Sequence, residues 1–256
     1  MVTCKLFGRY GNQLAQVSAT IAYAYKHKMN YAFPSETTIK TIWPKTYFST
    51  EPKEFPSGIH QVAWQPIGNV FSEAENQAYR EIPYYHDVCL NGHFQCYQYF
   101  EEYIRPIHHA LGFKWYSEAG FVSIHVRRTD YVDQVYRHPV ITNEYLAAAI
   151  GYMQENGFKD FAVFSDDLPW CEANINEERY PGAKFEYEPS GNDPAKSFQL
   201  MSCCHHNITC NSSYSKMAAH FNFHEDKIVI APKLWTNMPP NLWDTSGYLP
   251  PQWITF

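Results

Sequence analysis

The chain of 256 residues has no long hydrophobic run and no excess of basic residues. A membrane-spanning helix needs about 20 consecutive apolar residues, and no stretch approaches that length. The first residues, MVTCKLFGRYGNQ, reach glycine and polar residues after a very short apolar run, unlike a signal peptide. We therefore expect a soluble, cytoplasmic protein without a membrane span or a signal peptide.

The charge balance and the cysteines exclude two further classes. With 20 Lys and Arg against 26 Asp and Glu, the formal net charge is −6. A duplex-binding protein usually carries a broad basic footprint, so we expect no nucleic-acid partner and only a local anion site. The seven cysteines are an odd number without framework spacing, which is typical of reduced thiols rather than a disulfide scaffold.

Several ligand-binding motifs are also absent. The sequence contains no Asp-x-Asp pair, no GxGxxG and no P-loop, so a metal-bridged diphosphate is not indicated. The segment Cys203-Cys204-His205-His206 is rich in potential metal ligands. Because consecutive residues of a strand point to alternate faces, these four side chains cannot converge on one ion. We therefore expect no metal and no cofactor.

Short apolar runs alternate with segments of helical periodicity, which predicts βαβ units and a parallel sheet. The expected strands are 2–7, 121–126, 161–164, 206–210 and 227–231, and the expected helices are 12–28, 143–157, 196–204 and 215–223. Residues 40–95 are rich in proline, aromatic and polar residues and show no clear period. We assign no elements there.

Polar residues follow three of the expected strands. Ligands of open parallel sheets bind beyond the carboxyl ends of the strands. The residues at those ends are Arg127, Arg128 and Asp130, then Ser165, Asp166 and Asp167, and finally Asn211, Ser212, Ser213 and Ser215 at the start of a helix. A helix start can hold phosphate through its N–H groups and hydroxyls, and arginine binds phosphate through two hydrogen bonds. Together they indicate a diphosphate site.

Each of these segments has an ordinary structural alternative. Adjacent arginines often form one ion pair with a nearby acid and leave one solvated side chain. The segments FSDD (164–167) and NSSYS (211–215) can each simply cap the helix that follows. Near the start of the chain, FGRYGNQ (7–13) marks a tight turn from the first strand into the first helix.

Five segments resemble one enzyme family. GRYGNQLAQVSATIAYAYKHK (8–28) is similar to the N-terminal G-x-x-GNQ-[LM] motif of glycosyltransferase family 11, the α1,2-fucosyltransferases. SIHVRRTDY (123–131) resembles their HxRRxD motif, which protein O-fucosyltransferases and α1,6-fucosyltransferases share in related forms. Three later segments are similar to the family's later blocks, in the same order: FAVFSDDLPW (161–170), SFQLMSCCHHNITCNSSYSKMAAHF (197–221) and IVIAPKLW (228–235).

The resemblance implies an α/β fold of the GT-B type, in which two Rossmann-like halves face each other across a cleft. Residues 1–118 would form the acceptor-side half and 119–256 the nucleotide-sugar-binding half, with the C-terminal tail packing back on the first half. The implied reaction is an inverting, metal-independent transfer of L-fucose from GDP-β-L-fucose to a hydroxyl of a glycan acceptor, forming an α1,2 linkage. The expected partners are this donor and an oligosaccharide.

The resemblance also implies roles for single residues. Arg127 would clamp the diphosphate. Arg128 and Asp130 would order the loop or reach donor groups. The chemistry of transfer, apart from the resemblance, calls for a group that takes the acceptor's proton, and Asp130 would either do so or pair with an arginine instead. The remaining donor-site residues would be His125, Arg128, Asp166, Asp167, Asn211, Ser212, Ser213 and Ser215, and the opposite half would contribute Gly8, Arg9, Gly11, Asn12 and Gln13.

Two positions depart from the family pattern. Lys216-Met217 replaces a pair of tryptophans, and Thr129 stands where the family usually has glycine. Lys216 would either add positive charge near the donor or be an ordinary exposed lysine in the first turn of a helix. A transferase for another nucleotide sugar and a non-catalytic protein that binds a sugar nucleotide or a glycan are the alternative functions.

Overall fold

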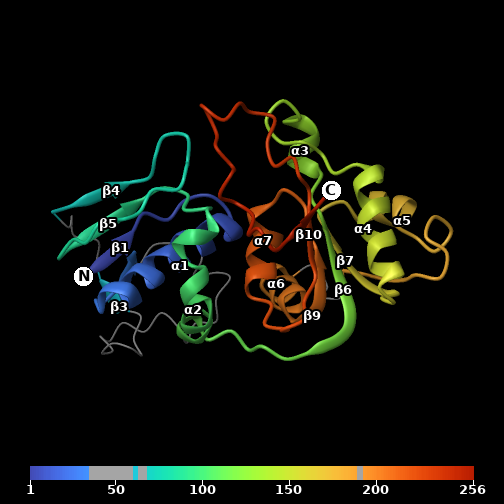
Figure 1. Ribbon diagram of the computed structural model, residues 1–256, viewed down its shortest axis with the longest axis horizontal. Helices are drawn as coiled ribbons and strands as arrows, with labels where there is room; N and C mark the ends of the chain where they lie inside the picture. Colours follow the sequence, from blue (N-terminus) through green and yellow to red (C-terminus); the bar gives the residue numbers. More distant parts are fainter. Residues whose placement is uncertain (35–59, 63–67, 189–192) are drawn as a thin grey trace. The chain divides into compact units, whose positions relative to one another are not determined.

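The computed structural model describes residues 1–34, 60–62, 68–188 and 193–256, which form two compact units (Figure 1). The first unit comprises Met1–Phe113 and Pro240–Leu249. The second comprises Lys114–Pro239 and Pro250–Phe256. The C-terminal part of the chain therefore contributes one segment to each unit.

The first unit contains a parallel sheet of three strands in the order β1-β5-β4. The strands are β1 (Val2–Cys4), β4 (Val70–Ser72) and β5 (Val88–Asn91), and a separate pair joins β2 (Ala32–Pro34) to β3 (His60–Val62). The helical segments are α1 (Tyr10–His27), η2 (Tyr97–Tyr99), η3 (Glu101–Tyr103) and α2 (Ile104–Leu111). Leu14, Val17 and Ile21 of α1 are buried, as their helical spacing predicts.

The second unit is built on a six-stranded sheet in the order β11-β10-β9-β6-β7-β8, and each neighbouring pair is parallel. The strands are β6 (Glu118–Val126), β7 (Asp160–Ser165), β8 (Lys184–Tyr187), β9 (Cys204–Ile208), β10 (Val229–Ala231) and β11 (Ile254–Thr255). The helices are α3 (Thr129–Asp133), α4 (Asn143–Glu155), α5 (Leu168–Asn174), α6 (Pro194–Cys203) and α7 (Ser213–His220).

The two faces of the central strand β6 meet different helices. In Figure 1, α4 and α5 lie on one side of this sheet and α6 and α7 on the other. Val122 and Ile124 pack into the apolar core with residues of α4 such as Leu146. Because side chains of a strand alternate between faces, His125 points to the other side, where its ring lies 5.4 Å from that of Tyr214 in α7.

The predicted α/β class with parallel sheets is confirmed, and two details differ from the expectation. The strand expected at 206–210 is Cys204–Ile208, so Thr209 and Cys210 lie beyond its carboxyl end. The strands β4 and β5 lie inside 40–95, where no element was assigned, and residues 35–59 and 63–67 lie outside the described part of the chain. Among the described helices, none combines the length and the apolar character that crossing a bilayer requires.

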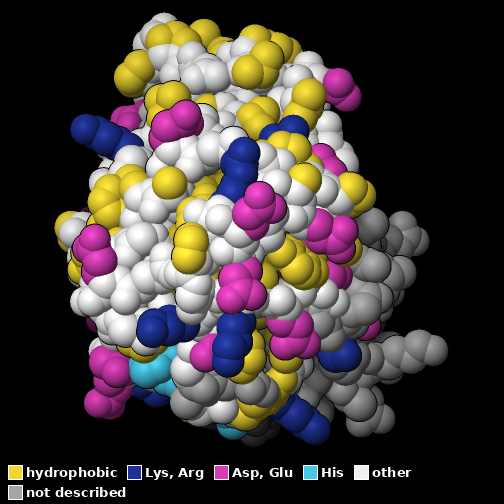
Figure 2. Space-filling model, turned by 90° about the vertical axis from the view of Figure 1, so that its right-hand side faces the viewer, with side chains coloured by type: hydrophobic (Ala, Val, Ile, Leu, Met, Phe, Trp, Pro, Cys, Tyr) yellow, Lys and Arg dark blue, Asp and Glu magenta, His cyan; other side chains and the backbone are white. Residues whose placement is uncertain are grey.

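Acidic and basic side chains are interspersed on the face of the molecule seen in Figure 2. No patch of a single sign dominates that face. This distribution agrees with the net charge of −6 and with the expectation that anion binding is local.

Candidate functional site

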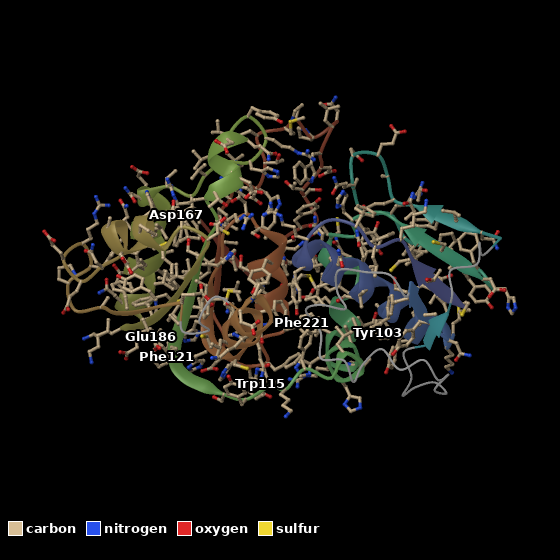
Figure 3. The ribbon with its side chains drawn as sticks, turned by 180° about the vertical axis from the view of Figure 1, so that it is seen from behind. Tyr103, Trp115, Phe121, Asp167, Glu186 and Phe221 are labelled. Atoms are coloured by element: carbon tan, nitrogen blue, oxygen red, sulfur yellow. The ribbon has the colours of Figure 1, made fainter. Side chains whose placement is uncertain are left out.

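The polar residues that follow three strands of the second unit meet at one edge of its sheet. Val126 at the end of β6 is in register with Ser165 of β7, and Ile124 of β6 is in register with Ile208 of β9. The strands are parallel, so the loops after them emerge at the same edge. Figure 3 labels Asp167 at this edge.

Arg127 is the centre of an ion-pair network at this edge. Its Nη2 lies 2.6 Å from Oδ1 of Asp130, which follows three residues later in the first turn of α3. Its Nη1 lies 2.9 Å from Oδ2 of Asp166, which follows β7. The Arg127 side chain is 20% exposed, so the guanidinium is held in a fixed orientation while part of it still faces solvent. Arg127 therefore forms ion pairs with nearby acids, as in the ordinary structural alternative, and it does so with two of them.

Arg128 is fixed by a second carboxylate and by an aromatic ring. Its Nε lies 3.1 Å from Oδ2 of Asp167, and its backbone N–H donates to Oδ1 of Asp166 at 2.9 Å. Its guanidinium carbon lies 4.1 Å from the ring centroid of Trp170 in α5, a cation–π contact. Asp167 also caps α5, because its side chain accepts a hydrogen bond from the backbone of Trp170.

Trp170 was not among the predicted site residues. The only signal for it in the sequence was its place in the segment FSDDLPW (164–170), directly after the two aspartates. Its contact with Arg128 depends on α5 turning back over the edge of the sheet, which the local sequence does not specify.

Asp166 is ionised at neutral pH. Burial raises the pKa of its carboxyl group, but the hydroxyl of Thr129, the N–H of Arg128 and the charge of Arg127 outweigh burial and lower that pKa from 3.8. The network as a whole holds two guanidinium groups and three carboxylates, so its formal charge is −1. The charge of each arginine is therefore compensated inside the protein.

His125 is buried beside a cysteine at the same edge. Its Nδ1 lies 3.0 Å from Sγ of Cys210, just beyond the end of β9. Burial lowers the pKa of His125 to about 4 and raises the pKa of the Cys210 thiol to about 12. Both groups are neutral at pH 7, so they share one hydrogen bond whose direction depends on the tautomer of the ring. Cys210 was not predicted as a site residue, since nothing distinguished it from an ordinary buried cysteine.

The start of α7 uses its polar side chains within the protein. Ser212 caps the helix by accepting a hydrogen bond from the N–H of Tyr214, so the capping alternative for NSSYS is realised. Ser215 Oγ accepts from the N–H of Cys210 at 3.4 Å. The Asn211 amide donates to the carbonyls of Pro139 and Trp235. Ser213 is partly buried in the first turn.

Lys216 is fully buried, which corrects the expectation of an ordinary exposed lysine. Its Nζ lies 5.5 Å from the ring centroid of Trp235, which is itself buried. A lysine in the first turn of a helix is usually solvated, but here the turn packs against the segment that follows β10. No local pattern in the sequence predicts this tertiary contact.

The predicted residues of the first unit surround the start of α1. Gly8 has a φ of +79°, and a Cβ added there would lie 2.6 Å from Nδ2 of Asn12, so only glycine fits. The amide of Gln13 donates to the carbonyl of Gly8 at 2.7 Å, and Gln95 donates to Oδ1 of Asn12 at 3.3 Å. The side chain of Arg9 is exposed at the N-cap, and Gly11 is buried in the first turn. Their role in binding remains a prediction.

Each of the two units is an α/β unit with parallel strands, and units of this kind make up the fold of GT-B glycosyltransferases. The solved structure of NodZ α1,6-fucosyltransferase soaked with GDP-fucose is similar in fold, with a TM-score of 0.51, 14% identity and coverage of 86% of this chain and 91% of that one. The chain belongs to glycosyl transferase family 11, whose family model matches residues 70–255.

Three relatives show how far the similarity extends. The Escherichia coli O-antigen biosynthesis glycosyltransferase WbnK is 36% identical over 127 residues, which are 46% of this chain and 40% of that protein. An E. coli α1,2-colitosyltransferase is 37% identical over 121 residues, covering 44% of this chain and 40% of that protein. The Bos taurus galactoside α(1,2)-fucosyltransferase 2 is 26% identical over 244 residues, covering 86% of this chain and 68% of that protein. The similarity to the two bacterial relatives thus spans about 40% of their length.

Proposed function

We propose that the protein is an inverting, metal-independent glycosyltransferase that moves L-fucose from GDP-β-L-fucose to a hydroxyl of a glycan acceptor and forms an α1,2 linkage. The observation that carries the proposal is the fixed guanidinium of Arg127 at the carboxyl end of β6, inside the HxRR motif and inside the segment that matches family 11. The similarity to an α(1,2)-fucosyltransferase over 86% of the chain supports the donor sugar and the linkage.

The chemistry of sugar transfer explains why this edge of the sheet needs arginines. Cleavage of the anomeric C–O bond builds negative charge on the departing diphosphate, and a fixed cation there lowers the barrier. Arg127 and Arg128 supply two cations that stay charged at any physiological pH. In this proposal they do the work that a metal ion does in other transferases, which is the basis for expecting metal-independent transfer.

The other residues of this edge would hold the arginines and the donor in place. Asp130 and Asp166 orient the Arg127 guanidinium through contacts of 2.6 and 2.9 Å. The hydroxyl of Ser213 and the N–H groups of the α7 start are suited to phosphate, and the neutral ring of His125 packs against Tyr214 in the first turn of that helix. Asp130 as acceptor of the proton from the acceptor hydroxyl remains a prediction, since its carboxylate is paired with Arg127.

A second candidate is the transfer of another 6-deoxy sugar, colitose. The relative named as an α1,2-colitosyltransferase is 37% identical over its matched segment, a higher identity than that of the fucosyltransferase. Colitose is fucose without its 3-hydroxyl. A site that hydrogen-bonds this hydroxyl discriminates strongly against the sugar that lacks it, whereas an apolar site does not.

Donor hydrolysis and product analysis test the proposal. The purified protein is incubated with GDP-β-L-fucose or with GDP-activated colitose, with and without a galactoside acceptor, in the presence of EDTA. We expect release of GDP without acceptor and faster release with it, and an α-linked fucosyl product by NMR. A protein that binds GDP-fucose, as a rise in melting temperature shows, but releases no GDP is a binding protein instead. Turnover of colitose alone would establish the second candidate.

A further inference from the structure

A second group of polar side chains lies at the opposite edge of the six-stranded sheet. His205 is the second residue of β9, and His224 and Asp226 lie in the loop between α7 and β10. One ligand atom from each of these three residues lies within 4.8 Å of the others. Nε2 of His205 is 2.9 Å from Oδ1 of Asp226, which is close to the spacing of two ligands on one metal ion.

The loop that carries His224 and Asp226 is tied to the start of β9. The amide of Asn222 donates to the carbonyl of Cys204 at 2.8 Å and to Oδ1 of Asn207 at 2.8 Å. The backbone N–H of His224 in turn donates to Oδ1 of Asn222 at 3.0 Å. Lys227 closes the loop from the other side, because its ammonium group donates to two backbone carbonyls, those of Ala219 and Asn222. Buried and partly buried hydrogen bonds therefore hold this loop against the start of β9 and place the three side chains next to one another.

Aromatic packing restrains the two imidazole rings. The ring of His205 lies between that of His206, at 4.1 Å and 14°, and that of His224, at 4.6 Å and 33°. Trp115 packs edge-on against His224 at 5.2 Å. A site whose ligands are restrained before binding loses less conformational entropy when the ion arrives. Figure 3 shows Trp115 and Asp167 at opposite ends of the second unit, so this group is separate from the arginine network.

The donor set is selective for one kind of ion. Two imidazoles and one carboxylate suit Zn²⁺ and similar divalent transition metals, whereas Mg²⁺ and Ca²⁺ prefer sites made of oxygen ligands. The Asp226 side chain is 73% exposed, so water can complete the coordination sphere. His206 is not part of the set, since its Nδ1 accepts a hydrogen bond from the backbone of Ile228.

We propose that His205, His224 and Asp226 form a binding site for a divalent transition-metal ion of the Zn²⁺ class. The prediction that Cys203-Cys204-His205-His206 does not converge on an ion concerned four consecutive residues, of which only His205 belongs to this set. His205 lies three residues, or about 10 Å at about 3.3 Å per residue, from Ile208 at the carboxyl end of the same strand. The site fastens the loop after α7 to β9 and takes no part in sugar transfer.

Metal titration of the untagged full-length chain tests the site. After dialysis against EDTA, the protein is titrated with Zn²⁺ by calorimetry and with Co²⁺ by visible absorption. We expect one equivalent bound, d–d bands of a nitrogen and oxygen site, a higher melting temperature with Zn²⁺, and no binding of Mg²⁺ in the same range. His205→Gln, His224→Gln and Asp226→Asn each weaken Zn²⁺ binding by at least about tenfold.

Two controls make the outcome decisive. His86→Gln changes an exposed histidine that also lies beside an aspartate, with 3.6 Å between His86 Nε2 and Asp87 Oδ2, and should bind Zn²⁺ like the unchanged protein. Melting in EDTA shows whether each variant folds, and the exposed Asp226→Asn offers a test even if a histidine variant does not. The proposal would be overturned if Asp226→Asn and the histidine variants bound Zn²⁺ with unchanged affinity. A thiolate-to-cobalt charge-transfer band would also overturn it, because this band shows that a cysteine binds the ion. Neither readout depends on transferase activity.

Discussion

Replacement of Arg127 by alanine removes the guanidinium that contacts Asp130 and Asp166. The proposed function requires this group at the diphosphate, where it stabilises charge that develops as the sugar leaves. In this variant Asp166 keeps its hydrogen bonds from the Thr129 hydroxyl and the Arg128 N–H, so its carboxylate is still hydrogen-bonded. The fold should therefore survive while transfer is lost.

The two effects differ in size. Loss of one fixed donor at a developing anion typically lowers kcat by about 10²–10³, or roughly 3–4 kcal/mol in barrier height. The ion pairs of Arg127 are partly exposed, with side-chain exposures of 19–31%, so the cost in unfolding free energy lies below the 3–5 kcal/mol of a fully buried pair. We expect about 1–2 kcal/mol. Arg127→Lys keeps the charge but cannot contact the diphosphate through two nitrogen atoms. The rate of this variant should therefore lie between that of the unchanged protein and that of Arg127→Ala.

Initial rates of GDP release from GDP-fucose with a galactoside acceptor give kcat/KM, and urea unfolding gives stability. Arg179→Ala, which removes an exposed arginine of the same unit, is the matched control and should behave like the unchanged protein. If Arg127→Ala is folded and its kcat/KM stays within about threefold of that of the unchanged enzyme, the assignment of Arg127 to the diphosphate is refuted. Loss of a fixed donor at the developing anion should lower kcat far more than threefold.

Three further predictions address the neighbours of Arg127. Cys210→Ala removes the hydrogen-bond partner of buried His125 Nδ1 and should lower the unfolding free energy by about 1–3 kcal/mol, whereas Cys210→Ser should lower it less; urea unfolding measures both. Since the folded pKa of Asp166 is lowered from 3.8, its contribution to stability is present above that value and is lost as the pH falls through the folded pKa. The unfolding free energy of Asp166→Asn, measured between pH 2 and 7, should lack this part of the pH dependence. If the profile of the variant is identical to that of the unchanged protein, the prediction for Asp166 is contradicted. Trp170→Ala removes the ring beneath Arg128 and should raise the KM for the donor with a smaller effect on kcat, while Trp170→Phe should preserve most of the contact; an unchanged KM in Trp170→Ala would rule out this role.

The sequence was informative where local pattern and burial agree. The strand β7 contains the apolar run FAVF (161–164) because both faces of the sheet are covered, and α1 carries the buried residues Leu14, Val17 and Ile21 at helical spacing. Strands β4 and β5 are three and four residues long and lie in a segment without periodicity, so no pattern distinguishes them from loop. Their pairing with β1 is decided by contacts distant in sequence.

The sequence predicts which strand ends bring polar residues to one edge of the sheet, but not the contacts that these residues make. Parallel strands explain why Arg127, Asp166 and Ser213 reach one edge, since only strand order and direction are needed for that inference. Which acid pairs with which arginine depends on side-chain geometry after α3 and α5 have packed. The burial of Lys216 depends on Trp235, a residue whose packing the local sequence does not encode.

The compensated charge of the arginine network has a consequence for release of the nucleotide. Asp130 and Asp166 occupy guanidinium positions that a diphosphate would also contact, so they compete with the nucleotide for Arg127. If Arg127 clamps the diphosphate as proposed, a departing GDP would be replaced by carboxylates that are already in place, and no bare cation would have to be resolvated. Such internal competition would weaken inhibition by the nucleotide product and favour rapid turnover, at some expense in affinity for the donor.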